Sequence, residues 1–151
     1  MSTILAFDFG EARIGVAMGS TELGIAHPLE TIATVETDKR FVRIEALIKE
    51  WQPTLCVVGL PLGLDGEEQL ASRLARKFAN RLTGRFGVSV TLVDERYTSK
   101  SASMALDDTG LRGRRQKPVL DQVAAMQILQ AFFEQGGEQV REQGGEQGGV
   151  A

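Results

Sequence analysis

The amino-acid sequence predicts one α/β domain built on a mixed five-stranded β-sheet that is flanked by helices. Near the N-terminus, three apolar segments are separated by short turns, which is typical of an antiparallel meander. Beyond them, apolar runs alternate with amphipathic segments, which indicates parallel strands connected by helices. The chain has 151 residues, of which 42% are hydrophobic, so it is long enough to bury a core as a single domain.

The meander is expected at the start of the chain. Residues 3–9 are mostly apolar and end at Gly10, and residues 13–18 follow after a spacer short enough to favour a hairpin. Residues 25–35 form a third extended segment, which is interrupted at Pro28.

A helix and a buried strand are expected next. Residues 39–51 have the apolar period of an amphipathic helix, which Asp38 could cap and which Pro53 ends. Residues 54–60 are continuously apolar, as expected for a strand that is buried on both faces beside a parallel neighbour.

The second half of the chain continues this alternation. Apolar side chains four residues apart indicate a long helix over residues 68–86, and residues 89–93 are expected to form the last strand. A short helix is expected from about residue 98 to residue 110, followed by a basic loop over residues 110–118. A final helix is expected from Pro118 through Phe133.

The chain ends in a segment that repeats Glu-Gln-Gly-Gly three times. We therefore expect a folded domain over residues 1–133 and a disordered tail over residues 134–151. The single cysteine, Cys56, excludes an internal disulfide and fits a reducing compartment. No apolar stretch approaches the roughly 20 residues that a membrane helix requires, so a cytoplasmic protein without membrane contact is expected.

Charge is segregated along the chain although the net charge is only −3. Residues 1–72 carry 5 basic and 11 acidic side chains, whereas residues 73–117 carry 11 basic and 4 acidic ones. Such asymmetry is a reason to consider a polyanion as the partner. The alternative is that a basic helix and an acidic helix only face water on different sides of the molecule.

Asp8 is the least expected residue of the first strand, because it lies between Phe7 and Phe9. A buried carboxylate without a partner costs several kcal/mol, so this one requires a cation, hydrogen-bond donors or a raised pKa. The alternative is a turn in which Asp8 caps the hairpin at Gly10.

Other acidic side chains are candidates for the same site. Asp94 and Glu95 follow the last predicted strand at its carboxyl end, where open α/β sheets bind ligands. The period of the strand places only one of the two on the face of the site, and the residues alone do not decide which. Asp121 falls in the first turn of the last helix, where it could simply interact with the helix dipole, although its apolar neighbours indicate that it leans inward.

Acids this far apart in the chain could converge only around an ion. A set of oxygen ligands without a Cys–His pair favours a hard cation, Mg²⁺ or Mn²⁺. The sole histidine, His27, gives little support to a zinc site or a His-dependent triad and is interpreted as structural.

Five short motifs occur in series within residues 3–133. They are Phe7-Asp-Phe-Gly-Glu-Ala-Arg-Ile-Gly-Val-Ala17, Val58-Gly-Leu-Pro-Leu62, Asp65-Gly66, Asp94-Glu-Arg-Tyr-Thr-Ser99 and Leu120-Asp-Gln-Val-Ala-Ala125. Together they resemble the YqgF/RuvX family, bacterial relatives of the Holliday-junction resolvase RuvC. The resemblance implies a ribonuclease-H-like fold.

The resemblance also implies which residues form the site. Asp8, Glu95 and Asp121 are implied to be the catalytic and metal-binding acids. Supporting roles are implied for four other residues, namely Gly10, Arg13, Arg96 and Thr98. Two positions depart from the family pattern, since Tyr97 stands where many members have Leu and Gln122 where Ser is common. Neither departure removes a carboxylate.

The activity implied is that of a nuclease that processes the 5′ end of pre-16S ribosomal RNA, with Holliday-junction resolution as the alternative. On this hypothesis Asp8 bridges two divalent ions about 4 Å apart, with Glu95 and Asp121 on either side. Phosphates of the nucleic acid would be bound by seven basic side chains, Arg73, Lys77, Arg81, Arg112, Arg114, Arg115 and Lys117.

Two other classes of protein are weighed against a nuclease. An ATPase of the actin and sugar-kinase superfamily shares such a core, but it needs a second domain for which this length leaves no room. A non-catalytic nucleic-acid-binding or ribosome-assembly factor would gain nothing from buried acids. The sequence leaves open whether the substrate is RNA or branched DNA, and whether the protein is a monomer or a homodimer.

Overall fold

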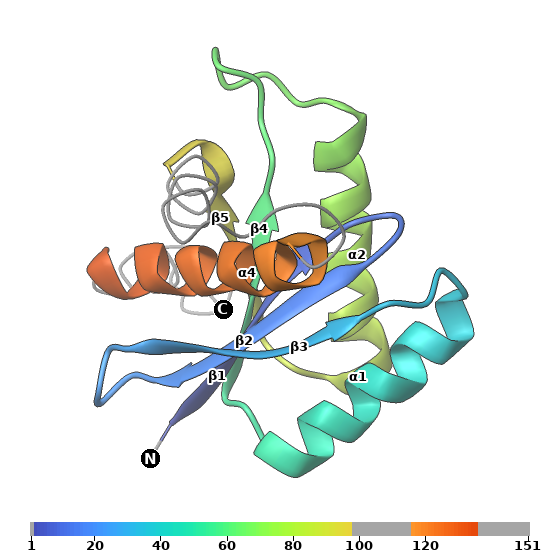
Figure 1. Ribbon diagram of the computed structural model, residues 1–151, viewed down its shortest axis with the longest axis vertical. Helices are drawn as coiled ribbons and strands as arrows, with labels where there is room; N and C mark the ends of the chain where they lie inside the picture. Colours follow the sequence, from blue (N-terminus) through green and yellow to red (C-terminus); the bar gives the residue numbers. More distant parts are fainter. Residues whose placement is uncertain (1, 98–115, 136–151) are drawn as a thin grey trace, which may run out of the picture.

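The computed structural model describes residues 2–97 and 116–135, and its centre is a five-stranded mixed β-sheet (Figure 1). In spatial order the strands are β3-β2-β1-β4-β5. Their bounds are Thr3–Phe9 (β1), Ile14–Ser20 (β2), Ala26–Ile32 (β3), Leu55–Leu60 (β4) and Val90–Asp94 (β5). The first three strands pair antiparallel, whereas β4 is parallel to both β1 and β5. The predicted meander and parallel strands are confirmed.

Helices cover both faces of the sheet. Helices α1 (Thr37–Trp51) and α2 (Leu70–Phe86) pack on one face, and α4 (Gln116–Glu134) crosses the other (Figure 1). A single 3₁₀ turn, Glu95–Tyr97, continues directly from the end of β5. The carboxyl ends of β1, β4 and β5 therefore lie along one edge, as in other open α/β sheets.

Side chains alternate between two separate cores. On β1, Leu5 and Phe7 are buried against α1 and α2, whereas Ile4 and Ala6 are buried against α4. Because successive side chains of a strand point to opposite faces, the next residue, Asp8, falls on the α4 face.

Two local features follow from sequence signals. Strand β3 is irregular at Pro28, where the register to β2 shifts, because proline cannot donate a ladder hydrogen bond. Helix α1 ends at Trp51, and its C-cap residue, Gln52, adopts a left-handed conformation immediately before Pro53.

The prediction that Asp38 caps α1 was wrong. The N-cap residue is Glu36, and it makes no side-chain capping bond. Asp38 lies inside the first turn, where a negative charge still interacts favourably with the helix dipole.

Other predictions lie wholly or partly beyond the described residues. They concern the short helix over residues 98–110, residues 110–115 of the basic loop, and residues 136–151 of the tail. Helix α4 begins at Gln116, so Pro118 lies in its first turn, where a missing N–H costs little. Within residues 2–97 and 116–135, no helix is long and apolar enough to cross a membrane.

Candidate active site

The site is centred on Asp8, which lies between two glycines of neighbouring strands. Asp8 pairs with Gly15 of β2, and Gly59 of β4 lies one position beyond the Phe7–Val58 pair. A Cβ atom at Gly15 would collide with the backbone carbonyl of Asp121, and one at Gly59 would lie 2.6 Å from Glu95 Oε2. The absence of side chains at both positions therefore leaves room for the two other acids beside Asp8.

The electrostatics of Asp8 reflect this crowding. Burial raises the pKa of Asp8 from its ordinary value of 3.8 to about 8, and the carboxylates of Glu95 and Asp121 push the pKa in the same direction. Both acids are thus electrostatic neighbours of Asp8, although they come from a different strand end and from α4. This is the arrangement expected where a bound cation balances several negative charges.

Asp121 is held by an arginine of the first hairpin. Arg13 donates from Nε to Asp121 Oδ2 at 2.6 Å, and both side chains are only partly exposed. The neighbouring Gln122 donates from Nε2 to Thr31 Oγ1 at 3.0 Å, which ties the start of α4 to β3. The family departure at Gln122 thus has a structural role in this chain.

Asp94 and Glu95 have different surroundings. The Asp94 carboxylate accepts hydrogen bonds from the backbone N–H and the guanidinium of Arg96, which lower its pKa. Glu95, in contrast, extends over Gly59 toward Asp8. Val93 of β5 faces the core beneath α4, and Glu95, two residues further on at the start of the 3₁₀ turn, is the acid that neighbours Asp8.

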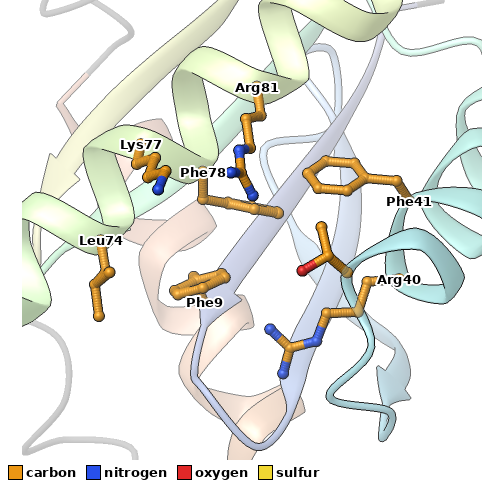
Figure 2. Close-up of a pocket in the computed structure, with 8 residues that line it drawn as sticks. Phe9, Arg40, Phe41, Leu74, Lys77, Phe78 and Arg81 are labelled. Carbon is orange, nitrogen blue, oxygen red and sulfur yellow. The ribbon is translucent and has the colours of Figure 1, made fainter.

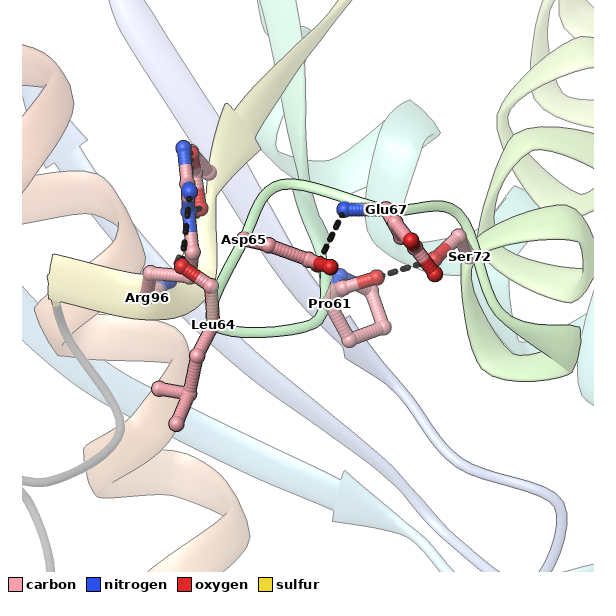
Figure 3. Close-up of polar contacts among 7 residues, drawn as sticks. Pro61, Leu64, Asp65, Glu67, Ser72 and Arg96 are labelled. Atoms are coloured by element: carbon pink, nitrogen blue, oxygen red, sulfur yellow. Dashed lines mark hydrogen bonds and ion pairs between the residues drawn. The ribbon is translucent and has the colours of Figure 1, made fainter.

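Arg96 braces the loop between β4 and α2 (Figure 3). It donates from Nη1 to the carbonyl of Leu64 at 3.4 Å and packs beside Gly66, whose φ of 86° suits glycine. In the same loop, the Glu67 N–H donates to Asp65 Oδ1, and the Ser72 hydroxyl donates to the carbonyl of Pro61. The described contacts of Arg96 therefore position the loop between β4 and α2.

The basic residues proposed for phosphate binding are not gathered at this site. Arg73, Lys77 and Arg81 lie on α2, which covers the face of the sheet opposite Asp8. The remaining predicted groups, Thr98, Arg112, Arg114 and Arg115, lie outside the described residues, as does the side chain of Lys117. Gly10 is required by the hairpin, because a Cβ there would lie 2.6 Å from the carbonyl oxygen of Arg13.

Sequence reasoning missed the two glycines that flank Asp8. Gly15 lies in the second strand and Gly59 in an apolar run, and neither glycine is conspicuous as a single residue. The signal that identifies the two glycines is their position in the strand register. Both lie beside Asp8, and Asp121 lies over Gly15 whereas Glu95 lies over Gly59. Pairing is a property of the folded sheet and is not visible in one strand alone.

The donor set fits a hard divalent cation in its chemistry, since all three candidate ligands are carboxylates. Burial and the two neighbouring carboxylates raise the pKa of Asp8, and a cation at this position would favour its ionised form. In the described parts of the chain, however, no three His, Cys, Asp or Glu side chains are already arranged as ligands of one metal ion. A bound ion would therefore have to draw the three carboxylates closer together. One of them, that of Asp121, is held by Arg13.

The fold and site together define a ribonuclease-H-like protein with acidic side chains at the end of its first strand. A family model described as "RuvX: Holliday junction resolvase" matches residues 2–135. The chain belongs to this RuvX family.

Relatives and solved structures agree with this assignment. A protein of Chromobacterium violaceum named "putative pre-16S rRNA nuclease" is 62% identical over 134 residues, which is 88% of this chain and 98% of the relative. A protein of Methylobacillus flagellatus with the same name is 58% identical over 131 residues, covering 87% of this chain and 90% of the relative. The structure of Thermus thermophilus RuvC with a Holliday junction substrate is 18% identical, with a TM-score of 0.54 over 91% of this chain and 97% of that chain. This last likeness concerns the fold.

Proposed function

We propose that this protein is a metal-dependent endonuclease that hydrolyses phosphodiester bonds of structured nucleic acid, with the 5′ end of pre-16S ribosomal RNA as its substrate in the cytoplasm. The observation that carries the proposal is the environment of Asp8. An ionised carboxylate that lies half-buried between two glycines and next to two further acids weakens the fold unless a cation is bound there. The names of the closely similar relatives support the choice of RNA.

Each residue has a distinct part in this proposal. Asp8, Glu95 and Asp121 would hold Mg²⁺ or Mn²⁺, which would supply Lewis-acid chemistry to water and to the phosphate. Arg13 orients the Asp121 carboxylate through its 2.6 Å contact. Gly15 and Gly59 leave room above the sheet for the backbone of Asp121 and the side chain of Glu95. Arg96 fixes the loop that borders the site.

Holliday-junction resolution is the second candidate. It is favoured by the description of the matching family and by the fold shared with RuvC. Cutting both strands of a junction symmetrically suits a dimer, whereas trimming one RNA end requires only a monomer. The mass of the active species would therefore help to separate the two substrates.

A purely binding role is the third candidate, and the site argues against it. A protein that only binds a polyanion gains nothing from gathering three acidic side chains near one another, because carboxylates repel phosphates. The corresponding test is direct, since such a protein would neither cleave nucleic acid nor need a divalent ion.

The experiment compares two substrates in parallel, a pre-16S 5′ fragment and a four-way DNA junction, with and without Mg²⁺ or Mn²⁺. Asp8→Asn is the test variant, and Asp38→Asn is the matched control, because Asp38 is an exposed acid of α1. We expect metal-dependent cleavage of the RNA by the wild type and the control only. Cleavage by purified Asp8→Asn at the wild-type rate would contradict the proposed site. Preference for the junction would shift the assignment to a resolvase.

A further inference from the structure

A cavity lies between α1 and α2, on the face of the sheet opposite Asp8 (Figure 2). Its volume is about 120 Å³. Phe9, Phe41 and Phe78 provide its apolar wall. Arg40 approaches from α1, whereas Lys77 and Arg81 extend from α2 toward the same space (Figure 2). Three cations from two helices therefore surround a small aromatic cavity.

Arg40 is buried without a described counter-charge. The residue is 6% exposed, and its Nε and Nη2 donate to the backbone carbonyls of Thr34 and Glu11 at 2.6 and 2.7 Å. Its guanidinium lies 5.5 Å from the centre of the Phe9 ring. Neutral carbonyls and a ring fix the orientation of the guanidinium but do not cancel its charge. Within the described residues, no carboxylate forms an ion pair with it.

Lys77 and Arg81, the two α2 cations at the cavity, differ from Arg76 on the same helix in their ion pairing. Arg76 is paired with Glu68, and on α1 Arg43 is paired with Glu30. In residues 2–97 and 116–135, neither Lys77 nor Arg81 has such a partner. They lie four residues apart and thus on the same side of α2. Two α2 cations without an ion-pair partner among the described residues therefore line the cavity together with Arg40.

A larger hollow adjoins this cavity. It has a volume of about 350 Å³ and shares Phe9 and Leu74 with the cavity, and it extends along Gly10, Glu11 and the start of α2. Its lining residues include one acid, Glu11, and no basic group. A negatively charged group is therefore favoured in the smaller cavity, and an uncharged group in the larger hollow.

We propose that this pair of hollows binds a nucleotide, with the phosphate among Arg40, Lys77 and Arg81 and the nucleoside along Phe9 and Leu74. The smaller cavity has room for a phosphate but not for a whole nucleotide, and the adjoining hollow supplies the remaining space. Guanidinium groups bind phosphate oxygens with several directed hydrogen bonds. The inference does not require the proposed cleavage, because the carboxylates lie across the sheet. The nucleotide comes either from solution or from the end of a nucleic-acid strand.

The test measures binding to the full chain by calorimetry in buffer with a chelator, so that no cleavage occurs. The ligands are AMP, adenosine and a short RNA with a 5′-phosphate. The test variants are Lys77→Ala and Arg81→Ala, singly and together, because both side chains are exposed and their loss should not unfold the protein. The controls are Arg76→Ala on the same helix and Lys49→Ala on α1, which remove the same charge away from the cavity.

We expect AMP to bind at least about tenfold more tightly than adenosine, and the double variant to lose about tenfold or more in affinity for AMP. Both controls and Asp8→Asn should bind AMP like the wild type. Tighter binding of the RNA than of AMP would identify a strand end as the natural source, and equal binding would identify a free nucleotide. Equal affinity for AMP and adenosine, unchanged binding by the double variant, or no AMP binding up to about 10 mM would each overturn the proposal.

Discussion

Asp8 and Phe9 are neighbours in the sequence, yet they belong to opposite faces of the sheet and to opposite charge environments. Asp8 lies near Glu95 and Asp121 on the face covered by α4, where burial and, after it, the two neighbouring carboxylates raise the pKa of Asp8 to about 8. Phe9 lies with Arg40, Lys77 and Arg81 between α1 and α2, where positive charge accumulates. The alternation of one strand thus separates the proposed metal site from a hollow that suits an anion.

On each face of the sheet, residues that suit ligand binding lower the stability of the fold. On the α4 face, Gly15 and Gly59 stand where side chains would otherwise pack, and their place is taken by acids. On the other face, the buried Arg40 lies among the aromatic residues of the cavity, where a charge costs stability. Elsewhere the sheet is covered by ordinary apolar packing, which stabilises both arrangements.

The largest expected effect separates the activities of the two faces. Asp8→Asn should lower the rate of cleavage by a factor on the order of 10³ or more, because it removes the central carboxylate. The same variant should keep its affinity for AMP, whereas the Lys77→Ala/Arg81→Ala double variant should show the reverse pattern. Parallel assays of cleavage and binding check this. If one variant abolished both properties, the two faces would not be independent.

The second effect concerns stability as a function of pH in the absence of divalent ions. The pKa of Asp8 is raised from 3.8 to about 8 on folding, so between these pH values the folded state binds more protons than the unfolded state. The free energy of unfolding should therefore fall as the pH rises through this window, with a contribution from Asp8 of several kcal/mol, and level off above it.

Urea unfolding at a series of pH values measures this effect, and Asp8→Asn isolates it. The variant carries no titrating group at this position, so it should gain stability relative to the wild type as the pH rises. Parallel curves for the two proteins would show that Asp8 ionises freely in the folded state. Addition of Mg²⁺ or Mn²⁺ should reduce the slope of the wild type, because a cation favours the ionised carboxylate.

A third effect tests the glycine that makes room for Asp121. Gly15→Ala should destabilise the protein by about 1–3 kcal/mol, since the new Cβ would collide with the start of α4. Gly84→Ala is the matched control, because no atom lies within 4 Å of a Cβ at this helical position. The control should be neutral or stabilise by up to about 1 kcal/mol. Equal denaturation midpoints for both variants would mean that α4 does not approach Gly15 closely.

The smallest effect concerns Arg13, a positioning residue. Arg13→Ala should lower the rate of cleavage by about 10- to 100-fold, as is typical when a partner of a metal-binding carboxylate is lost. Arg13→Lys should recover part of this loss by restoring the charge. Arg43→Ala removes a different ion-paired arginine and should leave the rate unchanged. If Arg13→Ala left the rate of cleavage unchanged, the contact between Arg13 and Asp121 would be an ion pair without a role in cleavage.

Much of the fold was predictable because its signals are local. The apolar runs of β1 and β4, the hairpin at Gly10 and the period of α2 each depend on residues close in sequence. The cap of α1 was not predictable, because the helix begins one residue before Asp38 without any side-chain capping bond. The sequence predicted an interruption of the third strand at Pro28, because proline has no backbone N–H to donate to a neighbouring strand. The register between β2 and β3 is irregular there.

The site was predictable only in part. Asp8 is conspicuous as a charge in an apolar strand, and the motif resemblance selected Glu95 over Asp94. The hydrogen bonds of Asp94 to Arg96 and the position of Gly59 become visible only once the strands are paired. The sequence predicted that Arg73, Lys77 and Arg81 of α2 bind the same nucleic acid as the carboxylates. The charges in a sequence do not tell which face of a sheet a helix covers.

Titration with Mn²⁺ tests most directly whether the three carboxylates share a divalent ion. Binding to the wild type, Asp8→Asn and Asp94→Asn can be followed by the loss of the free-ion resonance in electron paramagnetic spectra. We predict that the wild type and Asp94→Asn bind Mn²⁺ and that Asp8→Asn binds it at least about tenfold more weakly. Equal affinity of the wild type and Asp8→Asn, or no binding by the wild type, would contradict the account.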